Sequence, residues 1–296
     1  MRPDRRARRL ALALVPLFAT LSLLTACERV VDVDLATGDR LLVVEGRLEK
    51  VQGEAAVAQR IRLTTTDAYF SNSAPPAATG ATVRVTDDAG ATLRFTPSPA
   101  EPGTYVSPPF AAQVGRRYTL HVTWEGDQYQ GSDVLHAVSS IDSLYFAERN
   151  NVIGPREGLR ATIDTYDPGN ERNYYLWDQL VDGVRLIAAD SAFKARIIAN
   201  DDLVQGKPVR QFQPYGGMVV TPGQVVTVRQ VGLSEDGYRY YVALTDQVTN
   251  NGSPFAVATA SVRGNVANRT RPSRRALGYF MAGEVSEVTR TVPGAR

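Results

Sequence analysis

The stretch "ATVRVTDDAGATLRF", residues 81–95, decides the fold class of this chain. Apolar and polar residues alternate on both sides of Asp87-Asp88-Ala89-Gly90, and alternation with a period of two is typical of a strand with one buried face. Gly90 stands where a tight turn needs a positive φ, which glycine adopts without a steric penalty. The stretch therefore predicts a β-hairpin of two antiparallel strands.

The same alternation continues on both sides of this hairpin. It predicts strands at 41–49, 60–66 and 102–110 and a second hairpin at 115–132 that turns at Glu125-Gly126-Asp127. The Pro/Ala-rich segment 71–80 is predicted as a loop, because proline cannot serve a central strand. Six or seven short strands with a turn about every 8–12 residues are typical of a β-sandwich. We therefore predict a sandwich domain over residues 40–138.

The second half of the chain, residues 139–296, is predicted to form a second β-rich domain. Its predicted strands lie at 159–166, 173–183, 184–190, 223–232 and 276–292, the last either as one long strand or as a strand pair. Asp182-Gly183 is a two-residue hairpin signal between two of them. The sequence thus predicts a mainly β protein of two domains.

One segment of this second half departs from the period of two. Ser234 can cap a helix, and Glu235 and Asp236 suit a first helical turn. The apolar residues that follow recur at helical spacing, which predicts one amphipathic helix over about 234–250.

The first 26 residues have the features of a targeting segment. Five arginines precede an apolar stretch, Leu10 to Leu24, that is too short and too interrupted by proline for a comfortable membrane span. Leu24-Thr25-Ala26-Cys27 then matches a lipobox, in which cleavage follows Ala26 and the thiol of Cys27 carries a diacylglycerol. We therefore expect residues 1–26 to be a lipoprotein signal peptide and 27–39 to be an acylated tether. The alternatives are an ordinary cleaved signal with an incidental cysteine and a retained transmembrane helix.

Removal of this segment changes the charge of the protein. The full chain has 33 Lys and Arg against 31 Asp and Glu, and the segment takes with it five arginines and one aspartate. The mature protein is then close to neutral, at about −2, whereas nucleic-acid binding requires a basic face. With Cys27 acylated, no thiol is left for a disulfide or for a cysteine nucleophile. We therefore expect no nucleic-acid partner and no cysteine chemistry.

The sequence contains few residues that could form a catalytic or metal site. His121 and His136 are its two histidines, and neither has a partner at metal-ligand spacing. There is no Gly-x-Ser-x-Gly elbow, no Walker A loop and no His-Glu-x-x-His. Neighbouring carboxylates such as Asp201 and Asp202 lie in predicted turns. We expect no catalytic residues, no cofactor and no metal, with a hydrolase built on an unrecognised carboxylate pair as the alternative.

Two minor site hypotheses come from the second half. Asp164, Asp167 and Asn170 in "IDTYDPGN" are weak calcium candidates, because loop carboxylates and carbonyls suit a hard cation. Aromatic residues are also concentrated here, and exposed rings could stack on a sugar or contact a partner protein. The strand and helix patterns bury most of these rings, and we expect Tyr175, Tyr215 and Tyr240 to be the exposed ones.

The order of these features resembles one family. A lipobox cysteine followed by an acidic Val/Asp stretch, "LVVEGRL", "GATVRVTDDAG", "IDSLYF", "SEDGYRYYVAL", "NGSPF" and a terminal "ALGYF" together are similar to the bacterial lipoprotein family known as domain of unknown function 4249. The resemblance spans nearly the whole mature chain. It implies a lipoprotein of the Gram-negative outer membrane, often encoded beside a TonB-dependent transporter, and it carries over no catalytic or binding residues. The first half also resembles the transthyretin-like and carboxypeptidase-regulatory-like sandwiches.

From these features we expect a two-domain lipoprotein held at the outer membrane by Cys27. We expect it to act as a non-catalytic accessory or ligand-binding component, with a TonB-dependent transporter in nutrient uptake, and to bind a small ligand or a glycan. Anchoring would confine it close to the transporter and raise its effective concentration there. An adhesive or structural surface protein is the alternative.

Overall fold

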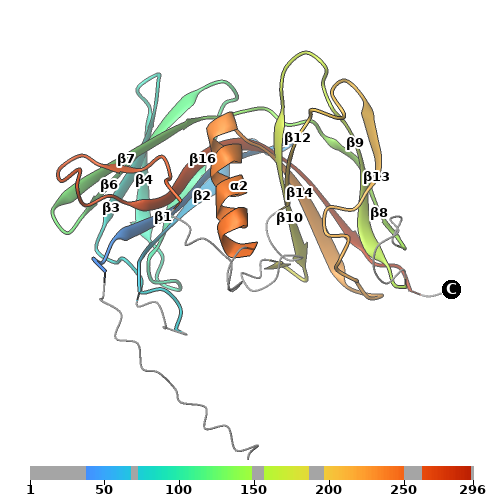
Figure 1. The fold of residues 1–296 in the computed structure, drawn as a ribbon, viewed down its shortest axis with the longest axis horizontal. Coiled ribbons are helices and arrows are strands. Elements are labelled where there is room, and N and C mark those ends of the chain that lie inside the picture. The colour runs from blue at the N-terminus through green and yellow to red at the C-terminus, as the bar shows by residue number, and fades with distance from the viewer. Residues whose placement is uncertain (1–37, 68–72, 149–156, 187–196, 250–261, 295–296) are drawn as a thin grey trace, which may run out of the picture. The chain divides into compact units, whose positions relative to one another are not determined.

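Strands make up most of the computed structural model, which describes residues 38–67, 73–148, 157–186, 197–249 and 262–294 (Figure 1). The strands are β1 (Leu42–Val51), β2 (Val57–Thr65), β3 (Thr82–Asp87), β4 (Thr92–Pro97), β5 (Thr104–Phe110), β6 (Arg117–Trp124), β7 (Asp127–Val134), β8 (Ile141–Ala147), β9 (Arg160–Tyr166), β10 (Tyr174–Val181), β11 (Val184–Arg185), β12 (Ile197–Asn200), β13 (Pro208–Phe212), β14 (Val225–Gly232), β15 (Ala267–Asn268) and β16 (Leu277–Thr291). The helix of the described part is α2 (Glu235–Thr249). The predicted mainly β fold with one helix is confirmed.

These strands form two sheets. The larger, mixed sheet has the order β11-β10-β14-β16-β1-β2-β5-β4-β3-β6-β7-β15, with β12 pairing beside β10. The smaller sheet has the order β13-β9-β8. We call the second one the small sheet.

The predicted turns are present. Gly90 joins β3 to β4 with a φ of 91°. At Asp182-Gly183, between β10 and β11, both central residues have positive φ, 51° and 78°, which is the backbone of a type I′ hairpin. Both of these hairpins therefore turn at the predicted residues.

β16 connects the two halves of the chain. Its first nine paired residues, Leu277 to Val285, run parallel to β1, and its last part pairs antiparallel with β14 up to Thr291. Of the two alternatives for 276–292, the structure has one long strand. Because β16 comes from the predicted second domain and pairs with β1 of the first, both parts share a strand. The division at residues 138 and 139 stays a prediction.

The larger sheet folds over on itself around the first core. Leu42 of β1 and Leu120 of β6 belong to the same hydrophobic cluster, although four strands separate β1 from β6 in the sheet order. This arrangement makes two facing layers, as in a sandwich.

Two further cores lie at the other end of the larger sheet. Leu144 of β8, Ile163 of β9 and Val228 of β14 share one cluster, so the small sheet packs against β14 and its neighbour β10. The other cluster lies under α2 and includes Tyr241 and Met281. Strand β10 is therefore covered on both faces, by the small sheet and by α2.

The helix begins as predicted. The hydroxyl oxygen of Ser234 accepts a hydrogen bond from the backbone N–H of Gly237 at 3.1 Å, which is the geometry of an N-cap. Within the described ranges no helix has the length and hydropathy that a membrane-spanning helix needs. The predicted signal peptide and the tether up to residue 37, including Cys27, lie outside the described residues.

Candidate functional site

A pocket of about 450 Å³ lies between β10, β12 and the small sheet. We call it the aromatic pocket, because five aromatic side chains line it together with aliphatic ones. These five are Tyr166, Tyr175, Trp177, Phe212 and Tyr238. Its polar lining comes from Ser139, Thr165, Asp167, Asn200 and Gln230. Pockets of this size with apolar walls and a few polar groups are typical of small-molecule sites.

The aromatic wall is built by the alternation of β10. Tyr175 and Trp177 lie two residues apart on one face of this strand, and their rings stack with centroids 5.5 Å apart. Phe212 of β13 packs edge-on against Trp177, with 4.9 Å between the ring centroids. The pocket wall is thus supported by both sheets.

Gln230 of β14 fixes the polar floor of the pocket. Its side chain is fully buried, and its Oε1 accepts a hydrogen bond from Trp177 Nε1 at 2.9 Å. Its Nε2 donates to the carbonyl oxygen of Ser139 at 2.9 Å and to Thr165 Oγ1 at 3.2 Å. A buried amide with both ends satisfied holds a single orientation.

Asp167 places a carboxylate at the pocket. The residue is 2% exposed, its Oδ1 accepts a hydrogen bond from the Tyr175 hydroxyl, and its Oδ2 accepts one from the backbone N–H of Gly206 at 3.2 Å. Burial raises the pKa of Asp167 above its ordinary value, and the charge of Asp201 adds to this rise, while the two hydrogen bonds oppose it. Burial and the bond to Asp167 in turn raise the pKa of the Tyr175 hydroxyl.

Two loops form the rim of the pocket. Tyr166 and Leu203 are 48% and 88% exposed there. The loops approach closely where Gly169 faces Gly206, since a Cβ on Gly169 would lie 2.9 Å from the Cα of Gly206. Glycine at both positions therefore lets the two loops meet beside Asp167.

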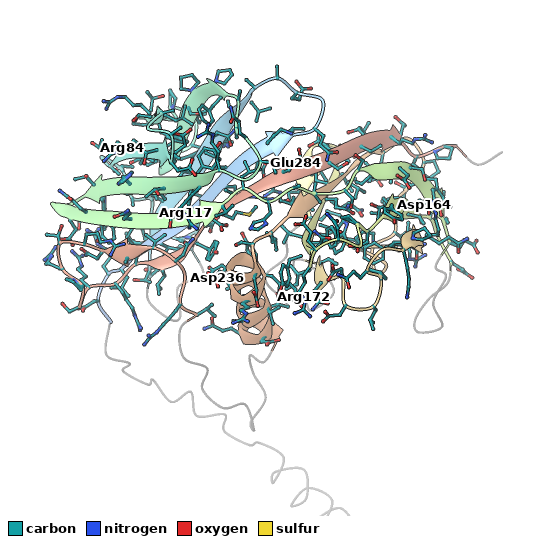
Figure 2. All side chains as sticks on the ribbon, turned by 90° about the horizontal axis from the view of Figure 1, so that it is seen from above. Arg84, Arg117, Asp164, Arg172, Asp236 and Glu284 are labelled. Carbon is teal, nitrogen blue, oxygen red and sulfur yellow. The ribbon has the colours of Figure 1, made fainter. Side chains whose placement is uncertain are left out.

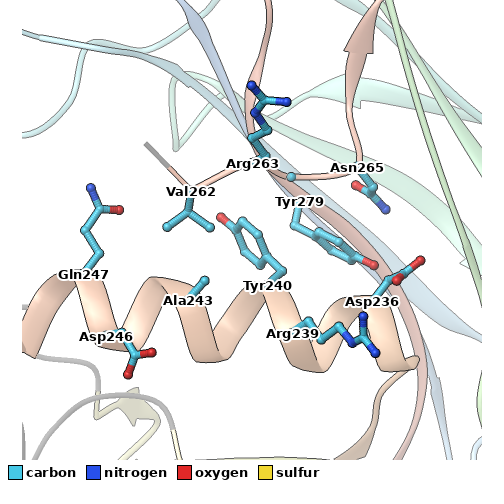
Figure 3. Close-up of a pocket in the computed structure, with 11 residues that line it drawn as sticks. Asp236, Arg239, Tyr240, Ala243, Asp246, Gln247, Val262, Arg263, Asn265 and Tyr279 are labelled. Atoms are coloured by element: carbon cyan, nitrogen blue, oxygen red, sulfur yellow. The ribbon is translucent and has the colours of Figure 1, made fainter. Parts of the chain in front are cut away.

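A second hollow, the α2 groove, runs along the exposed side of α2 (Figure 3). It measures about 650 Å³ and is lined by Asp236, Arg239, Tyr240 and Tyr279 among others. Tyr240 stacks on Tyr279 with ring centroids 4.9 Å apart. The α2 groove is open and has charges of both signs, whereas the aromatic pocket is more enclosed and has an ordered polar floor. We therefore take the aromatic pocket as the candidate site.

A cluster of charged side chains on the α2 side of the larger sheet is paired internally. We call Arg47, Glu49, Asp178, Arg229 and Glu287 the charge cluster. Arg47 Nη1 donates to Asp178 Oδ2 at 2.8 Å, and Arg229 contacts Glu49 at 2.6 Å and Glu287 at 2.7 Å. Burial alone would raise the pKa of Asp178, but Arg47, Arg185 and Arg229 lower it below its ordinary value. This pattern fits a structural ion-pair network.

The three aromatic residues predicted to be exposed have different positions. Tyr175 and Tyr215 are 6% and 2% exposed, so the predicted exposure is wrong for both, and Tyr240 is half-buried. Tyr175 is buried because the small sheet and α2 cover both faces of β10. Tyr175 nevertheless lines the aromatic pocket, Tyr240 lines the α2 groove, and the Tyr215 hydroxyl donates to the carbonyl oxygen of Trp177 at 3.0 Å.

The three calcium candidates have separate surroundings. The Asp164 carboxylate, on the small sheet in Figure 2, accepts a hydrogen bond from the backbone N–H of Gln211 at 2.8 Å. Asp167 instead faces Tyr175 and Gly206, and Asn170 is exposed. The described residues contain no group of three or more His, Cys, Asp or Glu side chains that could hold a metal ion.

The two histidines lie outside the pocket. His121 is half-buried on β6 with Nε2 3.0 Å from Thr86 Oγ1, and burial together with Arg84 lowers its pKa. His136 is exposed.

The sequence did not point to the partners of Tyr175 in this site. Asp167 is predicted only as a calcium candidate, and Trp177, Phe212 and Gln230 are not among the predicted site residues. The "YYLW" segment was a usable signal, because Tyr175 and Trp177 alternate on one face. No local pattern links them to Gln230, which reaches them only through the pairing of β10 with β14.

A protein-family model matches most of the chain. The family described as "Domain of unknown function (DUF4249)" matches residues 28–289. The chain belongs to this family. Among curated proteins nothing matches. All residues that line the aromatic pocket of this DUF4249 protein lie within the matched range, which begins directly after Cys27.

Proposed function

We propose that this DUF4249 protein is a non-catalytic, lipid-anchored component of the outer membrane that binds a small molecule in its aromatic pocket. The pocket carries this proposal, because its volume of about 450 Å³, its aromatic walls and its few oriented polar groups suit a small ligand. Gln230, Trp177 and Tyr175 form hydrogen bonds with other groups of the protein. These bonds support a binding role, because they fix the aromatic wall and the polar floor of the pocket in one orientation.

The proposed anchor is Cys27. The lipobox Leu24-Thr25-Ala26-Cys27 supports it, and the family match leaves the proposed signal peptide outside its range. The acyl chains on such a cysteine give stable attachment, because each buried CH₂ contributes about 0.8 kcal/mol. The proposed partner is a TonB-dependent transporter, as the family resemblance implies, and confinement to one membrane would raise the local concentration of the pair.

Ligand binding can be measured with a single-tryptophan protein. The chain has two tryptophans, so Trp124→Phe leaves Trp177 in the pocket wall as the only reporter. We expect a subset of polar and amphipathic small molecules to change its fluorescence in a saturable way, and Phe212→Ala to abolish that response. Tyr240→Phe in the α2 groove is the matched control and should leave it unchanged. A fluorescence signal that no small molecule alters would contradict the binding role.

Anchoring and partnership need a separate experiment in cells. Cys27→Ser should abolish fatty-acid labelling and release the protein from the membrane, because no other cysteine is present. Extraction of the wild-type protein in mild detergent should co-purify an outer-membrane transporter. A wild-type protein without label would refute the anchor, and a monomer that stays alone under crosslinking would refute the partnership.

An adhesive or structural role is the second candidate, and one observation favours it. Residues 40–138 contribute no side chain to the lining of the aromatic pocket. We infer that they form a transthyretin-like module that spaces the pocket from the membrane. Deletion of the pocket function by Phe212→Ala with retention of cell adhesion would favour this alternative.

A further inference from the structure

We infer that the aromatic pocket selects ligands that carry an organic ammonium group, which packs against the aromatic wall and pairs with the carboxylate of Asp167. This inference deepens the proposed function and rests on it. It names the chemical class of the ligand at the same site.

The charge of the pocket lining carries the first step. Among the described residues that line the pocket, Asp167 is the one charged side chain, and none is Lys, Arg or His. Both donors to its carboxylate, the Tyr175 hydroxyl and the Gly206 N–H, are neutral. A buried carboxylate without a cation is costly, because burial disfavours the charged form. A cationic ligand would supply the missing charge.

The residues behind Asp167 make the pocket more negative. Asp201 is 1% exposed, and its Oδ2 accepts a hydrogen bond from the backbone N–H of Asn173 at 2.8 Å. Arg172, in the loop before β10 (Figure 2), pairs with the exposed Asp202 instead. The side chain of Lys207 is exposed. Lys207 contacts Asp167 through its backbone carbonyl oxygen, which accepts a hydrogen bond from the N–H of Asp167 at 3.1 Å. None of these basic side chains forms an ion pair with Asp167 or Asp201 in the described part of the protein.

Other buried carboxylates in the described residues show the contrast. Asp127 is paired with Arg271 at 2.7 Å, and Asp178 with Arg47 at 2.8 Å. Asp133 also lacks a basic partner, but it lines none of the hollows described above. Asp167 is thus the carboxylate that is buried, lacks a cation and borders a cavity.

The aromatic wall supplies the second step. Faces of Trp and Tyr rings attract cations through the ring quadrupole, and aromatic cages bind quaternary ammonium groups in this way. Tyr175 and Trp177 stand on one face of β10, and Tyr166 and Tyr238 complete the lining from the rim and from α2. A volume of about 450 Å³ exceeds the size of a simple ammonium ion, which favours a substituted amine. A carboxylate or phosphate ligand would meet Asp167 without any basic group to offset the repulsion.

The test compares choline with its neutral isostere 3,3-dimethylbutan-1-ol, which has the same shape without the charge. Using the Trp124→Phe protein and Trp177 fluorescence, we expect choline to bind at least tenfold more tightly than the isostere. Asp167→Asn should remove this preference. Asp164→Asn, which changes a carboxylate of the same segment outside the pocket lining, should preserve it.

The outcomes separate this inference from the proposed function. Equal binding of choline and the isostere would overturn the ammonium inference and leave a working pocket. Saturable binding of uncharged or anionic small molecules, with no binding of either probe, would overturn it in the same way. A pocket that binds nothing at all would overturn both. If Asp167→Asn fails to fold, the comparison of the two probes on the protein with intact Asp167 still decides the question.

An ammonium group can come from a free amine or from a lipid headgroup. If the Cys27→Ser protein, which cannot be acylated, sediments with phosphatidylcholine vesicles and choline blocks this binding, the headgroup is identified as the source. Binding of soluble choline without binding to these vesicles would identify a free amine. Choline-insensitive binding to phosphatidylglycerol vesicles, with no binding of choline itself, would overturn the inference.

Discussion

Asp133 is a single residue whose ionisation should change the stability of the whole protein. It lies at the end of β7 next to the start of α2 and is 5% exposed, and its carboxylate accepts hydrogen bonds from the backbone N–H groups of Ala282 at 3.2 Å and Val134 at 2.9 Å. Burial raises the pKa of Asp133 to about 6, and Asp236 adds to the rise. The folded state therefore favours the protonated carboxyl.

The sign of the effect follows from linkage. A carboxyl with a raised pKa in the folded state contributes stability below its ordinary pKa of about 3.8, and this contribution is lost as the pH rises through about 6. We predict that Asp133→Asn flattens the pH dependence of the unfolding free energy between these values by about 3 kcal/mol. Urea denaturation at a series of pH values measures this dependence of the unfolding free energy. Asp142→Asn, at an exposed carboxylate, is the control, and identical slopes for wild type and Asp133→Asn would refute the prediction.

Local signals in the sequence identified turn and cap residues but not buried charges. Gly90, Gly183 and Ser234 act through their own backbone or the next turn, so their roles follow from neighbours in the chain. The surroundings of Asp133 and Asp167 come from segments far away in the sequence. Their burial therefore could not be predicted from local patterns.

At the scale of elements, the pairing of β16 with β1 depends on a glycine whose backbone lies very close to the neighbouring strand. Gly278 has a φ of 85°, and a Cβ there would lie 2.0 Å from the carbonyl oxygen of Val44 on β1. We predict that Gly278→Ala lowers the free energy of unfolding by about 3 kcal/mol or more, because it combines backbone strain with a clash against the neighbouring strand.

Gly53 is a matched control for this prediction. Its φ is 84°, and nothing lies within 4 Å of the Cβ position. Gly53→Ala should therefore cost only the backbone strain, about 1 kcal/mol. Thermal and urea unfolding of both variants would measure the difference. If both variants lost the same free energy of unfolding, the close approach of β16 to β1 would not be the reason that position 278 requires glycine.

Long, regular elements were predictable, and short, irregular ones were not. The helix over 234–250 and the strand over 276–292 have clear periods, and both are found as α2 and β16. β12 has four residues, and β13 begins with Pro208 and is interrupted by a register shift, so neither presents enough alternation to detect. Of the predicted strand 184–190, β11 covers Val184–Arg185, and residues 187–190 lie outside the described part.

At the scale of the whole molecule, the charge cluster links strands that the sheet order separates. β14 and β16 lie between β10 and β1, so the two strands would be roughly 14 Å apart in a flat sheet. Arg47 of β1 nevertheless contacts Asp178 of β10 at 2.8 Å. The register separates them further, because Arg47 is paired with Met281 of β16, whereas the β14 partner of Asp178 is paired with Glu287. The larger sheet therefore curves toward the α2 side here, and this curvature brings the ion pair together. The sequence shows both residues but not the curve, which results from the packing of the sheet around its cores.

The contribution of the charge cluster to the stability of the protein can be measured with substitutions. Asp178 is fully buried, and Arg47, Arg185 and Arg229 all lie within 4 Å of its Oδ2. We predict that Asp178→Asn lowers the free energy of unfolding by about 3–5 kcal/mol, because it leaves buried guanidinium groups without their anion.

The double variant Arg47→Met/Asp178→Leu should lose less free energy of unfolding than the sum of the losses of Arg47→Met and Asp178→Leu alone. It removes both charges and replaces them with apolar side chains that pack together. Urea denaturation of the four proteins gives the coupling energy, and strictly additive losses would mean that the two side chains contribute independently to the curved sheet.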